Sequence, residues 1–185
     1  MAKIGLNNFK YSVLNETDGV PSYAGAKSLG KAIDCKVSIE KYEAELYADD
    51  SLAESDNTFK KGTVTLTVDE DDDTVFAELL GHSVDEETGE MVRKDTDIAP
   101  YVGVGRILTK VVNGSYKYKV EFLPKVKFSE PEQEESTKGD SIEFKTPSVE
   151  GTVTKLADGT WSKSKTFTNK EEAITYLDGL LAKSA

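Results

Sequence analysis

Residues 101–128 read YVGVGRILTKVVNGSYKYKVEFLPKVKF, and this stretch decides the fold class. Asn113-Gly114 is a dipeptide that tolerates a positive φ at both central positions of a two-residue hairpin turn. Residues 102–112 are therefore expected to lead into the turn as one strand. Residues 115–128 return from it as the next strand.

The returning strand has a different composition on each face, by its period-two alternation. One face carries Tyr116, Tyr118, Val120, Phe122, Val126 and Phe128. The other face carries Lys117, Lys119, Glu121, Leu123, Lys125 and Lys127. Pro124 falls on the apolar parity and has no N–H to donate, so we expect a sheet edge or a bulge there.

The same alternation predicts strands elsewhere in the chain. One parity holds Ile33, Cys35, Val37 and Ile39, and a second strand alternates at Val64, Leu66 and Val68. Residues 142–153, interrupted at Pro147, and residues 161–167 are expected to pair with each other through a turn at Asp158-Gly159. Two glycines in one strand, Gly103 and Gly105, indicate a bulge or a close approach of another segment.

Two segments have helical spacing. Residues 73–80 begin with acidic residues and stop at Gly81, a natural position for the left-handed residue that follows a helix. Residues 169–183 form a C-terminal helix with Asn169 and Glu172 as capping residues and an apolar stripe. We therefore expect one domain, residues 1–185, that is mainly β: a β-sandwich or partly closed barrel with a short flanking helix and a C-terminal helix.

Two long polar segments are interpreted as loops. Residues 40–62 are acidic and carry scattered apolar residues, including Tyr47, Leu52 and Phe59. A loop of this length inside a compact domain is commonly functional. Residues 129–140 form a second, acidic loop with Glu130, Glu132 and Glu134.

Composition excludes several classes of protein. The formal net charge of −11 repels phosphate backbones and excludes adhesion to nucleic acid. Cys35 is the sole cysteine, so no intramolecular disulfide can form. No apolar run is long enough for a signal peptide or a membrane helix, and we expect a protein made in a reducing cytoplasm.

Residues that could support catalysis or bind a metal are few. His82, the sole histidine, is expected to be an exposed loop residue beside the end of the helix, and Cys35 a small buried hydrophobic residue. The acidic run 69–73 lacks the glycine and the glutamate that an EF-hand loop requires. We interpret it as a solvated turn that caps the helix, and we predict no enzymatic activity, no cofactor and no metal site.

Short stretches over nearly the whole chain resemble the major tail protein family of long-tailed bacteriophages that infect Gram-positive bacteria. They are Lys3-Ile4-Gly5-Leu6, Tyr23-Ala24-Gly25-Ala26, Ala44-Glu45-Leu46-Tyr47-Ala48-Asp49-Asp50, Ala99-Pro100-Tyr101-Val102-Gly103, Tyr116-Lys117-Tyr118-Lys119-Val120-Glu121-Phe122, Gly151-Thr152-Val153 and Trp161-Ser162-Lys163. The resemblance implies a tail tube subunit in the virion, assembled in the host cytoplasm. Six copies would form a ring, and rings would stack head to tail into the conduit for DNA ejection. Tape measure, tail terminator and tail-tip proteins are the implied partners, and DNA would pass without specific binding.

This resemblance suggests which residues contact a neighbouring subunit. We expect the segment 40–62 to reach that subunit, with Tyr47, Leu52 and Phe59 as apolar anchors. The lysines Lys117, Lys119, Lys125 and Lys127 are candidates to pair with the acids Glu130, Glu132 and Glu134 of the neighbour. Two other classes stay open: a monomeric β-sandwich module for binding or decoration, with an aromatic-lined groove, and an enzyme.

Overall fold

The computed structural model describes residues 2–48, 51–69, 72–85, 87–131 and 146–182, with side chains from residue 4 onward except those of 44–57. Over this part, the chain is mainly β with two helices, as predicted. The helices are α1 (Asp73–Leu80) and α2 (Lys170–Leu181). The strands are β1 (Ala2–Thr17), β2 (Val20–Tyr23), β3 (Lys27–Gly30), β4 (Ala32–Ala48), β5 (Ser51–Val68), β6 (Ser83–Val84), β7 (Met91–Val92), β8 (Tyr101–Val112), β9 (Ser115–Phe128), β10 (Ser148–Val153) and β11 (Lys163–Phe167).

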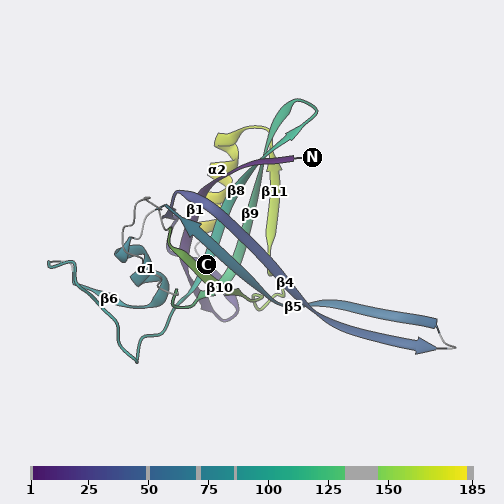
Figure 1. The fold of residues 1–185 in the computed structure, drawn as a ribbon, viewed down its shortest axis with the longest axis horizontal. Helices are drawn as coiled ribbons and strands as arrows, with labels where there is room; N and C mark the ends of the chain where they lie inside the picture. The colour runs from purple at the N-terminus through teal and green to yellow at the C-terminus, as the bar shows by residue number, and fades with distance from the viewer. Residues whose placement is uncertain (1, 49–50, 70–71, 86, 132–145, 183–185) are drawn as a thin grey trace, which may run out of the picture.

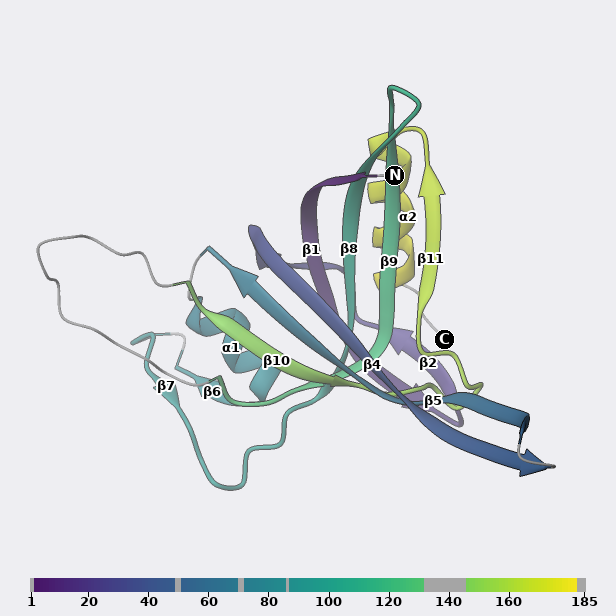
Figure 2. The ribbon, with the colours of Figure 1, turned by 45° about the vertical axis from the view of Figure 1, so that its right-hand side comes forward.

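Nine of the described strands form one antiparallel sheet. Its order is β2-β1-β8-β9-β10-β5-β4, with β3 also paired to β1 and β11 to β9. The sheet coils so that β4 and β5 cross the face formed by β1, β8 and β9 (Figure 1, Figure 2). It does not close, because among the described residues β4 pairs only with β5. None of the described helices is long and apolar enough to cross a membrane.

The β8–β9 hairpin forms as predicted. Asn113 has a φ of 50° and Gly114 a φ of 76°, and Val112 pairs with Ser115 across the turn. Left-handed conformations at both central residues twist the turn in the sense that the strands require.

Pro124 lies at a β-bulge, which confirms the expectation for that residue. Val102 pairs with Val126, whereas Val104 pairs with Leu123, so β9 has one more residue than β8 between these pairs. One extra residue moves the side chains beyond it to the opposite face of the sheet.

The predicted single lysine face of β9 is therefore wrong. Lys117 and Lys119 lie on one face of the sheet, whereas Lys125 and Lys127, beyond the bulge, lie on the other. The apolar residues of β9 also change face at the bulge. Val120 and Phe122, before the bulge, lie in a different apolar core from Val126 and Phe128, beyond it. The core enclosed by the coiled sheet and α1 contains Phe9, Tyr11, Leu66, Leu79, Val104, Leu123, Val126 and Phe128. The core under α2 contains Ile107, Val120, Phe122, Leu156, Ala173, Leu177 and Leu181.

Gly103 and Gly105 allow the close approach that their position in a strand indicates. A Cβ atom at Gly105 would lie 2.2 Å from Cδ1 of Leu177 on α2. At Gly103 it would lie 2.7 Å from the ring of Tyr23. Side chains at these two positions would therefore push α2 and β2 away from β8.

Residues 40–62 are a β-hairpin arm, and their interpretation as a loop is wrong. The pairing of β4 with β5 continues from Ala32 and Val68 to Ala48 and Ser51, with register shifts after Ala32, Glu40 and Leu46. β4 has 17 residues and β5 has 18, and their distal halves project from the body of the molecule (Figure 1). Backbone pairing holds the arm together there, so its sequence does not need the alternation that a buried face imposes.

Two further strand predictions need correction. β10 and β11 do not pair with each other, because β10 lies between β9 and β5 whereas β11 pairs with residues 118–122 of β9. Ile33 is 50% exposed, since a register shift between Ala32 and Asp34 turns it away from the core. Cys35 on the same strand is half-buried against the core, close to its expected environment.

Both helices begin and end near the predicted residues. The carboxylate of Asp72 accepts hydrogen bonds from the backbone N–H groups of Thr74 and Val75, so the described part of the acidic run caps α1 as expected. Gly81 ends α1 with a φ of 81°. Asn169 caps α2 through the N–H of Glu171.

Candidate functional site

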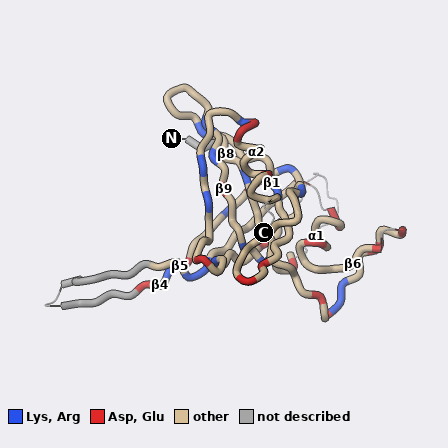
Figure 3. Tube along the Cα trace, turned by 180° about the vertical axis from the view of Figure 1, so that it is seen from behind, with Lys and Arg blue, Asp and Glu red and all other residues tan. Residues whose placement is uncertain are grey.

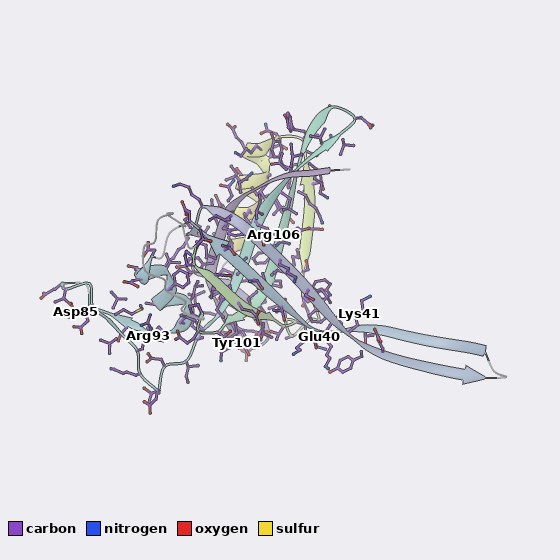
Figure 4. All side chains as sticks on the ribbon, in the orientation of Figure 1. Glu40, Lys41, Asp85, Arg93, Tyr101 and Arg106 are labelled. Atoms are coloured by element: carbon purple, nitrogen blue, oxygen red, sulfur yellow. The ribbon has the colours of Figure 1, made fainter. Side chains whose placement is uncertain are left out.

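The β4–β5 arm has opposite charge at its base and along its distal part. At its base, Glu40 pairs with Lys61 at 3.4 Å and with Lys60 at 3.9 Å (Figure 4 labels Glu40 and Lys41 at this point). The distal part, residues 43–57, contains six acidic residues and no lysine or arginine. The distal arm therefore carries a dense negative charge without counter-charges of its own.

An aromatic stack attaches the base of the arm to the body. The ring of Phe59 on β5 lies parallel to the indole of Trp161, with centroids 4.8 Å apart and planes inclined by 4°. Trp161 stands in the connection between β10 and β11. Phe59, which we expected to anchor the segment on a neighbouring subunit, makes an apolar contact within its own chain. The side chains of Tyr47 and Leu52 lie outside the described side chains.

Three strands of the sheet have the opposite charge to the arm. β8, β9 and β11 together contain eight lysine or arginine residues and one acid, Glu121, although the chain as a whole is acidic. Figure 3 shows the basic residues along the β9 side of the sheet. We refer to these three as the basic strands.

Charges on one face of the basic strands are partly paired. Glu121 accepts hydrogen bonds from Arg106 and Lys119, each with an N–O distance of 2.6 Å. Arg106 also contacts Sγ of Cys35 on β4. Burial raises the pKa of Glu121, but the hydrogen bonds and charges of Lys119 and Arg106 outweigh burial and hold that pKa below its usual range.

Lys125 and Lys127 lie on the other face and have partners in their own chain. Lys125 pairs with Glu16 at 2.5 Å. Its ammonium lies 4.9 Å from the ring centroid of Tyr101, and that of Lys127 lies 5.6 Å from the same ring. These two predicted interface lysines are therefore separated from Lys117 and Lys119 and are engaged locally.

The side chain of His82 is largely covered rather than exposed, and a carboxylate lies at each ring nitrogen. Its side chain is 5% exposed, with Nδ1 2.8 Å from Asp97 and Nε2 2.5 Å from Glu130. The bond to His82 and the N–H of Lys94 lower the pKa of Asp97. Glu130, predicted to meet a neighbour's lysine, thus meets a histidine of its own chain. Glu132 and Glu134 lie outside the described residues.

Sequence reasoning missed the polar contacts that hold the helices to β1. The hydroxyl of Tyr11 donates to Oε2 of Glu78 on α1 at 2.5 Å, and Lys27 pairs with Oε1 of the same residue. Lys10 pairs with Asp178 on α2 at 2.6 Å. These partners are far apart in sequence, so no local pattern could have identified them.

The described residues include an open depression, and they have no group of side chains arranged as metal ligands. No group of three or more histidine, cysteine, aspartate or glutamate side chains among them is arranged to hold a metal ion. An open depression beside β1 and β3 is lined by Asn7, Asn8, Ser28, Lys31 and Asp69, among others. Its one aromatic residue, Phe9, is 1% exposed, so this depression presents no ring face to a sugar.

Comparison with known proteins leaves the family unassigned. A scan against protein-family models and a search of curated proteins found no match to this chain. The arm and the basic strands are therefore interpreted from their own geometry and charge.

Proposed function

We propose that this chain is the structural subunit of a phage tail tube. Six copies form a ring, and rings stack head to tail into a hollow conduit for DNA. The observation that carries this proposal is the β4–β5 arm, which projects from the body without packing on the described core (Figure 2). A long ribbon that adds nothing to its own core is explained by contacts with another molecule. The sequence resemblance supplies the type of assembly.

The open sheet supports an assembly of this kind. Among the described residues, β4 has no strand partner on its outer side. An unpaired edge presents free N–H and C=O groups and is a liability in a monomer, whereas pairing in a closed ring removes it. Projecting arms make head-to-tail contacts between unlike surfaces, which generate both closed rings and open stacks.

The acidic composition suits a conduit for DNA. A ring of six carries six times the formal charge of −11. Acidic residues facing the lumen would repel the phosphate backbone within about 8 Å at physiological salt, so DNA would pass without adhering. In this proposal the tape measure, tail terminator and tail-tip proteins are further partners, and the tail of the virion is the location.

The test is the assembly state of the purified protein. We expect the concentrated protein to form hollow tubes or stacked rings in negative-stain electron micrographs, with matching fast species in sedimentation velocity. A matched variant replaces residues 44–56 with Asn-Gly, because Glu43 and Asn57 are paired and would flank a two-residue turn. This variant should fold and remain monomeric. A full-length protein that stays monomeric at high concentration contradicts the proposal and favours a binding module.

A further inference from the structure

Three lysines lie side by side across neighbouring strands. The register pairs Lys3 with Lys110, and Lys110 with Lys117. Like charges directly opposite each other destabilise a sheet. No ion pair among the described side chains involves Lys110 or Lys117, unlike Lys119, which pairs with Glu121. This lysine row (Lys3, Lys110 and Lys117) is therefore a concentration of positive charge in which no described ion pair compensates Lys110 or Lys117.

The lysine row lies on a face of the sheet without the exposed tyrosine next to it in sequence. Successive residues of a strand point to opposite faces, so Tyr116, which is 59% exposed and pairs with Val111, lies on the face opposite Lys110 and Lys117. The row therefore presents mainly positive charge, and an acidic segment would complement it.

The distal arm has that composition. Residues 43–57 contain six acids together with Leu46, Tyr47 and Leu52. The arm leaves the body on a different side from the β8–β9 turn, near which the lysine row lies (Figure 1, Figure 2). The two surfaces are therefore placed to meet between molecules rather than within one.

We propose that the acidic arm of one copy docks on the lysine row of a second copy. The inference rests on the proposed function in that it names the acceptor surface for the arm. Carboxylates of the arm neutralise the row and relieve the repulsion between its members. The contact joins two different surfaces, so each copy still offers a free arm and a free row.

A second copy fits the row better than nucleic acid does. The row amounts to three lysines, so it lacks the extended basic footprint with which proteins bind a phosphate backbone. The arm is a short acidic segment and matches a surface of this size. If the protein binds duplex DNA and the substitution of Lys110 and Lys117 abolishes that binding, nucleic acid rather than a second copy occupies the row.

The test reverses the charge of each surface in the full-length chain. Lys110→Glu with Lys117→Glu should weaken self-association at least about tenfold, because a complementary contact becomes repulsive. Adding Glu54→Lys and Asp56→Lys, two positions apart on β5, to the same chain should restore it. The two introduced glutamates are again like charges opposite each other, and the one at position 110 also lies opposite Lys3, so we expect no loss of monomer stability.

A matched control carries the same change in net charge elsewhere. Lys155 and Lys170 are exposed, in the β10–β11 connection and the first turn of α2. Lys155→Glu with Lys170→Glu should associate like the wild-type protein. Circular dichroism and thermal unfolding verify that each variant is folded before its association is measured by sedimentation velocity.

The outcomes separate this inference from the proposed function. If tubes form equally well with a reversed row, the docking inference is overturned and the proposed tube function stands. If the row substitutions weaken an association that forms no rings or tubes, the docking inference is supported and the proposed tube function is overturned. A reversed row that the arm substitutions fail to rescue overturns the pairing of arm and row. A wild-type chain that stays monomeric overturns both.

Discussion

The aromatic rings of Phe59 and Trp161 are stacked 4.8 Å apart and nearly parallel. Phe59 is on β5 where the arm leaves the body, and Trp161 precedes β11, one of the basic strands. Offset stacking of two rings contributes about 0.5–1.5 kcal/mol beyond the area that they bury. The stack therefore links the direction of the arm to the sheet from which it projects.

Phe59→Leu should loosen the arm while keeping most of the apolar contact. Trp161 is the sole tryptophan, so its fluorescence reports this site alone. We expect a red-shifted emission, a loss of about 1 kcal/mol of stability and weaker self-association. Phe167→Leu, which alters the contact of Phe167 with Tyr176 on α2, is the control and should leave the emission unchanged. An unaltered spectrum in Phe59→Leu would contradict a role for the stack.

The two glycines of β8 and α2 should respond to alanine in opposite directions. Gly105→Ala places a Cβ in the space of Leu177, and overpacking of this kind costs about 1–3 kcal/mol. Gly179 on α2 has no atom within 4 Å of an added Cβ, so Gly179→Ala should stabilise the helix by up to about 1 kcal/mol. Denaturant unfolding of both variants measures the two changes. Equal effects would show that α2 does not pack on β8 as described.

The sequence predicted those parts of the fold that have local causes. The Asn113-Gly114 turn and the caps at Asp72 and Asn169 each depend on a few neighbouring residues, so propensity was sufficient. The sequence predicted an edge or a bulge at Pro124, but we assigned the faces of β9 as if the alternation continued unchanged past that residue. The bulge moves every later side chain to the opposite face. A bulge must be counted when faces are assigned, because one residue reverses all that follow.

The arm and the environment of His82 were missed for two different physical reasons. Alternation reports a buried face, and the distal arm pairs through its backbone, so its polar sequence was taken for a loop. His82 acquires its environment from Asp97 and Glu130, which are 15 and 48 residues away. Only the tertiary fold brings these partners together. The charge of the basic strands was visible in the sequence, and the predicted two-residue turn fixes the pairing of Lys110 with Lys117. The alignment of Lys3 with Lys110 depends instead on the pairing of β1 with β8, which no local pattern predicts.

Tyr11→Phe should destabilise the protein in a pH-dependent way. The hydroxyl of Tyr11 donates to the carboxylate of Glu78, and a hydrogen bond to a charged group contributes about 1.5–3 kcal/mol. Burial raises the pKa of Glu78, but hydrogen bonds from Lys27 and Tyr11 outweigh burial and lower it below its ordinary value of 4.5. The stabilisation from Glu78 is therefore complete above its unfolded-state pKa and is lost as the pH falls through the lower folded-state pKa.

The cost of Tyr11→Phe should accordingly be full at neutral pH and shrink below pH 4.5. Urea unfolding of both proteins at several pH values measures this difference. Tyr176→Phe is the control, since the structure gives Tyr176 aromatic and cationic neighbours rather than a carboxylate. A cost that does not change with pH would mean that Tyr11 acts through packing alone.

Self-association should weaken as salt is added, because the arm and the lysine row attract each other through exposed charges. The screening length falls from about 8 Å at 0.15 M salt to about 3 Å at 1 M. Sedimentation velocity at increasing sodium chloride concentrations should therefore show a steadily rising dissociation constant. The chain with both surfaces reversed, Lys110→Glu and Lys117→Glu with Glu54→Lys and Asp56→Lys, should follow the same curve, since its charges remain complementary. In the chain with only the row reversed, salt screens a repulsion and should improve association instead. Opposite slopes for these two chains distinguish a charge-matched contact from apolar association, in which added salt would act on both in the same direction.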